Sequence, residues 1–372
     1  MELAAAAEAF ATETLAGQGH PEDDAEARTR ARDYLVSLGG GGWFDRIERQ
    51  DLRACCLVRE ALAGASPLAD AVFALQALAA TPILLFANDE TRERWLPALI
   101  AGDAMGAFAM TEPGAGSDVQ SLATTAVKDG DHYVLNGRKS FISNAGIADV
   151  YVMFASTDSG AGSRALSTFV VPADTEGFSF AGAQVMSAPH PLGELELDDC
   201  RVPAAAMLGR EGDGFKIGMA TLDRLRPTVA AAACGMAERA LTEAIAHALE
   251  RHQFGQALAD FQLIQQKLAR MATELAAARF LVYRAAWEKD QGAERITLEA
   301  AMAKAYATEA AQRIVDDAVQ ILGGRGVLAD SVVDHLYRAV RALRIYEGTT
   351  EIQHLVIAGQ VLKRYREKGS AP

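Results

Sequence analysis

The sequence predicts an α+β protein that is mostly helical, with helices at both ends and a β-rich region between them. Three observations predict this class. Residues 25–99 are rich in Ala, Leu, Arg and Glu, β-rich runs begin near Gly106, and long amphipathic segments resume beyond Gly214. We therefore expect an N-terminal helical domain over 1–105, a middle antiparallel β domain over 106–213 and a C-terminal helical bundle over 214–372.

The first region shows helical spacing of apolar residues. Apolar residues recur at spacings of three to six, which is compatible with several short helices: Leu57, Leu62, Leu68, Val72, Leu75 and Leu78. The glycine run Gly39–Gly42 interrupts this pattern. No strand precedes the run and no Gly-Lys-Ser/Thr follows it, so we interpret it as a helix terminator or loop and not a phosphate loop.

The middle region shows a hairpin signal and further β-rich runs. Asn136-Gly137 stands between two β-rich runs, and this dipeptide suits a type I′ turn because both residues tolerate positive φ. We expect strands at His132–Leu135 and Ser140–Ile142, with others at Asp149–Ser156, Leu166–Pro172 and Glu194–Val202. These predict a small antiparallel sheet or barrel.

The last region predicts long helices joined by short loops, which is typical of a helix bundle. One apolar face is formed by residues that alternate spacings of four and three from Ile264 to Val282. Comparable amphipathic segments are Thr228–Arg251, Leu298–Leu322, Ser331–Leu343 and Thr350–Tyr365.

Composition excludes several classes of protein. The chain has 372 residues, half of them hydrophobic, and a net charge of −13, which disfavours nucleic acid and anionic membrane partners. The four cysteines have no metal-ligand spacing, so we expect no metal site. Acidic residues near the N-terminus do not suit a targeting signal, and we expect no apolar stretch of the ~18 residues that span a bilayer. A cytoplasmic location is expected.

Two stretches could contact a planar cofactor. The loop Phe108–Asp118 contains Gly114 and Gly116, whose backbone N–H groups are accessible, together with the hydroxyls of Thr111 and Ser117. Taken alone, this pattern is also that of an ordinary loop. Phe141 and Ser143 alternate along a strand, so one flat ring and one hydroxyl project on the same side. A buried aromatic on a core strand is the alternative interpretation.

A third stretch, Ile345–Gln353, predicts the start of a helix. Thr350 and Gln353 have capping-box spacing, and Gly348 loosens the backbone before them. Glu347 is either a carboxylate favoured by the helix dipole or a general base on a flexible turn.

Together these stretches resemble the acyl-CoA dehydrogenase family, in order over essentially the whole chain. The signature regions correspond to Ala109–Asp118 and Tyr346-Glu347-Gly348-Thr349. Further matching motifs are Asp223–Pro227, Arg251-x-x-Phe254-Gly255, Phe261-Gln262 and Gln320–Gly326. The resemblance implies a four-helix C-terminal domain, a homotetramer and bound FAD.

The resemblance also implies a role for each matching residue. Glu347 would be the catalytic base that removes the α-proton of an acyl-CoA while the β-hydride passes to the flavin. The flavin ring would be surrounded by Phe108, Met110, Thr111, Phe141 and Ser143. Ser117 would also bind the cofactor, and Thr349 and Glu351 would touch FAD beside Glu347. The pyrophosphate and adenosine end of FAD would be held by Arg251 and Phe254 together with Gln320 and Gly324 of a partner chain, and Phe261 and Gln262 would also bind FAD. The resemblance implies that the Arg251 and Gln320–Gly324 motifs complete the FAD site of a neighbouring subunit. Substrate would be bound by Ser117, Asp223, Arg226 and Gly348.

The implied activity is α,β-dehydrogenation of an acyl-CoA thioester, with electrons passed to an electron-transfer flavoprotein. Alternatives are an oxygen-using acyl-CoA oxidase, a dehydrogenase acting on an acyl-carrier-protein thioester, or a non-catalytic helical scaffold. Leu225 occupies the other position at which some relatives carry the base, and leucine cannot accept a proton.

The chain departs from the family at Pro189-His190-Pro191 and at Gly359, where many relatives have polar or charged residues. Both departures fall where the outer part of CoA would lie. We therefore expect weaker recognition of that part, with His190 either contacting the ligand or occupying a surface turn.

Overall fold

The computed structural model describes residues 2–158 and 165–369 and divides into two compact units. Unit 1 comprises Met1–His20, Leu52–Asp70 and Asp223–Pro372, and unit 2 comprises Pro21–Asp51 and Ala71–Leu222. The helices of the first hundred residues are therefore shared between the units. The three-domain boundaries expected from the sequence stay a prediction.

Unit 2 contains a group of helices whose ends follow ordinary capping chemistry. The helices are α2 (Asp24–Gly40), α3 (Asp45–Glu48), most of α5 (Pro67–Phe86) and α6 (Asp89–Ala101). The Asn88 side chain accepts a hydrogen bond from the Thr91 amide at the start of α6, and Gly102 ends the helix with φ +78°. Helix α2 ends at Gly40, within the glycine run that predicted a helix terminator.

Helix α5 corrects one expectation from the sequence. By length and composition Pro67–Phe86 is apolar enough to cross a membrane, with a mean hydropathy of 1.8 over its best window. However, 83% of that window is buried inside the protein, as in the core helix of a soluble protein. The expectation that no apolar stretch is long enough to span a bilayer is therefore wrong for this helix, by length and composition.

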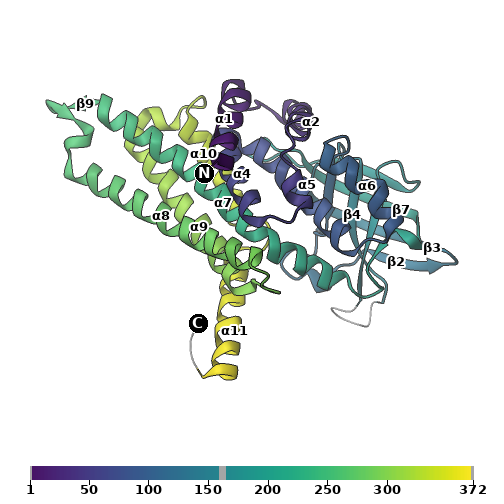
Figure 1. The fold of residues 1–372 in the computed structure, drawn as a ribbon. Helices are drawn as coiled ribbons and strands as arrows, with labels where there is room; N and C mark the ends of the chain where they lie inside the picture. Colours follow the sequence, from purple (N-terminus) through teal and green to yellow (C-terminus); the bar gives the residue numbers. More distant parts are fainter. Residues whose placement is uncertain (1, 159–164, 370–372) are drawn as a thin grey trace. The chain divides into compact units, whose positions relative to one another are not determined.

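The sheet of unit 2 contains, within the described residues, eight strands in the order β6-β7-β3-β2-β4-β5-β8, with β1 beside β4 (Figure 1). Most neighbouring strands are antiparallel, as expected, but β1 pairs with β4 in parallel and β2 meets β4 in parallel at a single residue pair. The strands are β1 (Gly106–Ala109), β2 (Thr125–Asp129), β3 (His132–Ser143), β4 (Val150–Ser156), β5 (Leu166–Pro172), β6 (Phe178–Ala183), β7 (Leu192–Pro203) and β8 (Met207–Leu208).

The predicted hairpin turn at Asn136-Gly137 is wrong. Strand β3 runs through both residues, and the hairpin closes instead between Asp129 of β2 and His132 of β3. Gly137 lies at a register shift against β7 with φ +152°, and a Cβ there would lie 2.6 Å from Thr124 Oγ1. A glycine is therefore needed at position 137, because the strand bulges there and Thr124 approaches its backbone closely.

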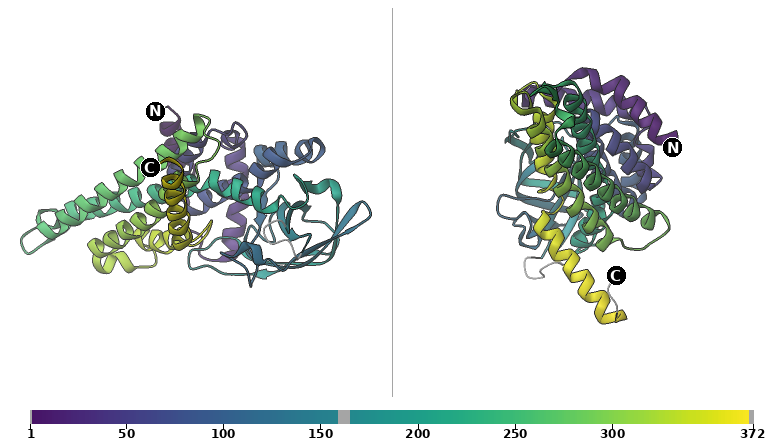
Figure 2. Two further views of the ribbon diagram at one scale, coloured as in Figure 1. Left: turned by 90° about the horizontal axis from the view of Figure 1, so that it is seen from below. Right: turned by 90° about the vertical axis from the view of Figure 1, so that its left-hand side faces the viewer.

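Unit 1 contains the helix bundle predicted for the end of the chain. Its long helices are most of α7 (Gly214–Glu250), α8 (Gln262–Asp290), α9 (Thr297–Leu322), α10 (Val332–Leu343) and α11 (Thr350–Lys368), with α1 (Glu2–Phe10) and α4 (Leu52–Ala65). Helix α9 packs against α8, α10 and α11. The short hairpin of β9 (His252–Gln253) and β10 (Gln256–Ala257) lies at the tip of the α7–α8 pair (Figures 1 and 2).

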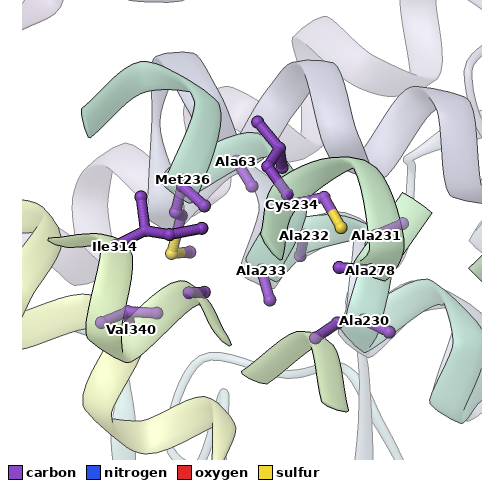
Figure 3. Close-up of a cluster of buried hydrophobic side chains, with 14 of the residues drawn as sticks. Ala63, Ala230, Ala231, Ala232, Ala233, Cys234, Met236, Ala278, Ile314 and Val340 are labelled. Atoms are coloured by element: carbon purple, nitrogen blue, oxygen red, sulfur yellow. The ribbon is translucent and has the colours of Figure 1, made fainter. Parts of the chain in front are cut away.

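Small side chains allow the helices of unit 1 to approach closely. The core cluster combines an alanine-rich stretch of α7 with apolar residues of α4, α8, α9 and α10 (Figure 3). A Cβ on Gly235 of α7 would lie 1.9 Å from the carbonyl oxygen of Glu60 on α4, so only glycine fits there. This contact fixes α4 against α7, and the two helices supply Arg59 and Arg226 to the site described next.

Candidate functional site

Glu347 lies in a tight turn between α10 and α11. Its φ is +55° and that of the following Gly348 is +93°, so two consecutive residues adopt left-handed backbone conformations. Such a conformation is uncommon for a residue with a side chain and is found at functional sites. A Cβ on Gly348 would lie 2.5 Å from Gln353 Nε2. Glycine therefore suits this position for two reasons: it adopts the positive φ without strain, and it leaves room for the Gln353 side chain.

Three side chains hold the carbonyl groups of this turn. Arg226 Nε donates to the Glu347 carbonyl over 3.0 Å. The Gly348 carbonyl accepts from Lys304 Nζ at 2.6 Å and from Gln353 Nε2 at 3.0 Å. These bonds come from α7, α9 and α11, so the position of Glu347 is determined by three different helices.

The Glu347 carboxyl group is poorly solvated. Its Oε2 atom is buried and has no hydrogen-bond partner in the structure. Desolvation raises the pKa of Glu347, while the positive charges of Arg59, Lys304 and Arg226 oppose that rise. A carboxyl group with a raised pKa and an open acceptor position is suited to general-base chemistry.

Buried charges surround the turn. Arg59 makes a bidentate pair with Asp70, at 2.7 and 2.8 Å, and also donates to Thr228 Oγ1 at 2.9 Å. Desolvation lowers the pKa of Lys304 to about 8, while the negative charge of Glu347 favours the protonated amine. The site therefore balances the carboxylates of Glu347 and Asp70 against several fixed cations.

The helix start after the turn differs from the predicted capping box by one residue. Thr349, not Thr350, caps α11, with its hydroxyl oxygen accepting from the Ile352 amide at 3.3 Å. Thr350 instead donates to Glu309, and Gln353 binds the Gly348 carbonyl. Glu351 is exposed in the first turn of α11.

Asp223 and Arg226, both predicted to bind substrate, lie on α7 and pair with each other at 2.9 Å. Asp223 also accepts from Thr297 and Arg295. The structure thus brings Asp223, Arg226, Glu347, Gly348 and Thr349 into one connected group, in which Arg226 supports the turn.

The predicted flavin-ring residues lie in unit 2. Phe108 packs against Phe154 with ring centroids 4.9 Å apart, and Met110 is buried. The loop that follows is anchored by a buried ion pair, Lys139 Nζ to Glu112 Oε1 at 2.7 Å. The Thr111 carbonyl accepts from the Ser140 amide, which fixes the loop beside β3. Ser117 is exposed.

Phe141 and Ser143 flank buried Ile142 at the end of β3, beside a register shift. The Phe141 ring is 60% exposed and its φ is +56°, a strained conformation for an aromatic residue. The Ser143 hydroxyl lies 2.7 Å from His190 Nε2. An exposed flat ring next to a hydroxyl fits a flavin, which combines apolar ring faces with polar edge atoms.

The remaining predicted FAD residues lie at the tip of the bundle. Phe254 and Gly255 form the β9–β10 turn with φ of +54° and +86°, as a type I′ turn requires. The Phe254 side chain is 95% exposed and meets Phe261 edge-on, at a centroid distance of 6.3 Å. Arg251 and Gln262 are also exposed, while Gln320 and Gly324 lie at the end of α9 and just beyond it.

Sequence reasoning missed Lys304, Arg59 and Gln353 as contributors to the site. A signal existed for Lys304, because it falls on the buried alanine stripe of α9 between Ala300 and Ala307, where a charge must have a partner. In residues 2–158 and 165–369, no three His, Cys, Asp or Glu side chains form a group that could hold a metal ion.

Three family models match the chain. They are described as the N-terminal domain, the middle domain and the C-terminal domain of acyl-CoA dehydrogenase, and they match residues 2–103, 107–200 and 212–362.

Curated proteins and solved structures give the same result. A 3-(aryl)acrylate reductase of Clostridium sporogenes is 44% identical over 316 residues, or 84% of each chain. The caffeyl-CoA reductase–Etf complex subunit CarC of Acetobacterium woodii is 44% identical over 77% of this chain and 76% of its own length. The structure of butyryl-CoA dehydrogenase from Megasphaera elsdenii superposes with a TM-score of 0.90 at 36% identity, covering 97% of both chains.

Proposed function

The chain belongs to the acyl-CoA dehydrogenase family, and we propose that it transfers a proton and a hydride at carbons 2 and 3 of an acyl-CoA thioester, with Glu347 as the base. It is an FAD-dependent oxidoreductase. The observation that carries the proposed mechanism is the buried, unpartnered Oε2 of Glu347 on a turn held by Arg226, Lys304 and Gln353.

The chemistry requires a base of suitable strength. A C–H group next to a thioester is a very weak acid, so its removal needs a base whose pKa is raised and a donor for the carbonyl oxygen. Desolvation raises the pKa of Glu347 in the required direction. We propose that the thioester carbonyl accepts a hydrogen bond from the main-chain N–H of Glu347, as the resemblance implies. Bound FAD would accept the hydride from carbon 3.

The side chains of unit 2 would hold the ring of FAD. Phe141 offers an exposed ring and Ser143 a hydroxyl. Phe108, Met110 and Thr111 lie on and just after strand β1, and the Thr111 carbonyl accepts from the Ser140 amide of β3. The remaining predicted roles are also proposals. Ser117 would contact FAD and substrate, and Thr349 and Glu351 would lie beside the base. The distal part of FAD would be held by Arg251, Phe254, Phe261, Gln262, Gln320 and Gly324.

The electron acceptor is proposed to be an electron-transfer flavoprotein. This is supported by the 44% identity to a subunit of a caffeyl-CoA reductase–Etf complex. Since that relative and the acrylate reductase are named for reduction, the direction of the reaction also needs testing. The same base serves both directions, because the protonated Glu347 would return a proton to carbon 2 in the reduction. A cytoplasmic homotetramer is the proposed form of the protein.

A titration tests the proposal directly. The purified protein should carry about one FAD per chain, and a saturated acyl-CoA should bleach it anaerobically. Reoxidation by an electron-transfer flavoprotein, by oxygen or by an enoyl-CoA would separate dehydrogenase, oxidase and reductase. Comparison of CoA, dephospho-CoA and pantetheine thioesters with one carrier-protein thioester would identify the carrier. Protein that neither contains nor rebinds FAD would exclude every one of these activities.

A further inference from the structure

One segment of unit 2 packs beside the end of β3 and is fixed at both ends. The Gln184 amide donates to the Leu192 carbonyl at 3.0 Å, and the Asn144 amide donates to the Pro191 carbonyl at 2.9 Å. Arg28 donates to the Leu192 carbonyl at 2.9 Å and to the Ala145 carbonyl at 2.6 Å. Residues 184–192 are therefore held against β3 by main-chain and side-chain bonds.

Two side chains of this segment contact the predicted flavin residues. Gln184 Oε1 accepts from the Phe141 amide at 2.7 Å, and Gln184 Nε2 donates to Ser140 Oγ at 2.9 Å. His190 Nε2 lies 2.7 Å from Ser143 Oγ. The sequence predicted that His190 either contacts CoA or occupies a surface turn. In the structure its ring is instead within hydrogen-bond distance of the Ser143 hydroxyl.

A serine hydroxyl has one hydrogen and two lone pairs, so its first partner decides what it can offer to a second. If His190 accepts, the hydrogen of Ser143 is used; if His190 donates, that hydrogen stays available. Desolvation lowers the pKa of His190 to about 4, with Asp24 opposing this shift and Arg28 adding to it. The imidazole is therefore neutral at physiological pH, and one of its nitrogen atoms carries a hydrogen.

We propose that His190 is a positioning residue of the flavin site: its Nε2–H donates to Ser143 Oγ and leaves the serine hydrogen directed at an acceptor on the polar edge of bound FAD. Gln184 positions Phe141 in a similar way. Its side-chain oxygen accepts from the Phe141 amide and so stabilises the left-handed backbone conformation of that residue. This inference rests on the proposed function, since it requires that Ser143 contact FAD.

A double-mutant cycle between His190 and Ser143 tests the proposal. The variants are His190→Phe, Ser143→Ala and their combination, compared by FAD dissociation constant and by the absorption spectrum and midpoint potential of bound FAD. His190→Phe should weaken FAD binding about two- to tenfold, the range for one neutral hydrogen bond, and shift the flavin spectrum. It should add nothing in the Ser143→Ala background, because its effect acts through that hydroxyl.

Two further variants distinguish positioning from packing. His190→Gln places an amide donor at a similar reach and should restore the wild-type spectrum. The His190→Asn side chain is too short to reach Ser143 and should show the weakened FAD binding expected for His190→Phe. It replaces His190→Phe as the loss variant if the phenylalanine variant does not fold. His132→Phe, at the exposed β2–β3 turn, is the matched histidine control. The inference is overturned if His190→Phe leaves FAD binding and the flavin spectrum unchanged. It is also overturned if His190→Phe has the same effect in the Ser143→Ala background as in the wild-type chain. Neither result would contradict the proposed function. A wild-type chain unable to bind FAD would overturn the proposed function as well.

Discussion

Arg226 links two groups of the site: its Nε donates to the Glu347 carbonyl over 3.0 Å, while its Nη1 donates to Asp223 Oδ1 at 2.9 Å. The guanidinium is buried, and two of its nitrogen atoms bind the turn that carries the base and the neighbouring Asp223. This role differs from the substrate contact implied by the resemblance. The two roles predict different kinetic effects.

Replacement of Arg226 by lysine separates positioning from substrate binding. Lysine keeps the charge but loses the forked geometry that reaches both the carbonyl and Asp223. We expect kcat to fall about ten- to a hundredfold with KM nearly unchanged, because the base is displaced while the pocket remains. The control is Arg239→Lys, in the half-exposed pair with Glu243 on the same helix. A rise in KM with normal kcat would instead assign Arg226 to substrate.

Glu347→Gln should bind FAD and thioester normally but lose turnover by several orders of magnitude. The amide preserves the shape of the side chain and has no basic lone pair of suitable pKa. Stopped-flow measurement of flavin bleaching would detect the loss independently of the electron acceptor. The exposed Glu367→Gln on α11 provides a matched control. Bleaching at the wild-type rate would show that another group removes the proton.

The same substitution should make the protein more stable at neutral pH. The folded state raises the pKa of Glu347 above its usual value of 4.5, so it binds the proton more tightly than the unfolded state does. Stability therefore falls as pH rises from about 4.5 through the raised pKa, and the full penalty remains above it. Denaturant unfolding should show Glu347→Gln to be more stable at pH 7, with the difference vanishing below about pH 4.5. A less stable variant at pH 7 would contradict this sign.

Lys304→Met should move the pH dependence of catalysis. Desolvation lowers the pKa of Lys304 to about 8, and the positive charge of its protonated amine opposes the rise in the Glu347 pKa. Without this charge, the acidic limb of the kcat/KM profile should shift to higher pH. Lys289→Met removes another lysine that donates to main-chain carbonyls and should leave the limb in place. An unmoved limb in Lys304→Met would exclude the electrostatic coupling.

The sequence predicted several elements well, because their periodic patterns depend on many residues, but the longest helix, α7, begins at Gly214 and not near the expected Thr228. Helices α9 and α10 and strands β4 and β5 lie within one residue of their expected bounds. Local signals carried by one or two residues were less dependable. Asn136-Gly137 has the composition of a turn, but in the sheet Gly137 is required by the approach of Thr124, which is 13 residues earlier in the chain.

Contacts between distant segments explain the gaps in the predicted site. Lys304 precedes Gly348 by 44 residues, and His190 follows Ser143 by 47. The resemblance singled out Glu347, Gly348 and Ser143 as predicted site residues, but it carried no information on which side chains support them. These supports became visible only when the helices and strands were placed in three dimensions.

Arg226 lies on α7 and Arg251 directly follows the end of that helix, so the two residues are about 37 Å apart at 1.5 Å per residue. Arg251 therefore cannot reach the turn of Glu347 in its own chain. Near Arg251, the exposed Phe254 and the strained hairpin turn present a surface suited to a neighbouring molecule. Leu355, Leu362 and Tyr365 leave a further apolar face exposed on α11, whose end extends beyond the other helices of unit 1 (Figure 2).

We predict that Arg251→Ala weakens FAD retention in a partner subunit, and mixed oligomers can show this. Arg251→Ala and Glu347→Gln are each expected to be impaired, since one lacks a contact to the FAD pyrophosphate and the other lacks the base. In a refolded mixture, a site that combines Glu347 from the first variant with Arg251 from the second is complete, so activity should return. Each variant refolded alone is the control. No recovery in verified mixed oligomers, or a monomer that holds FAD tightly, would assign Arg251 to its own chain's cofactor.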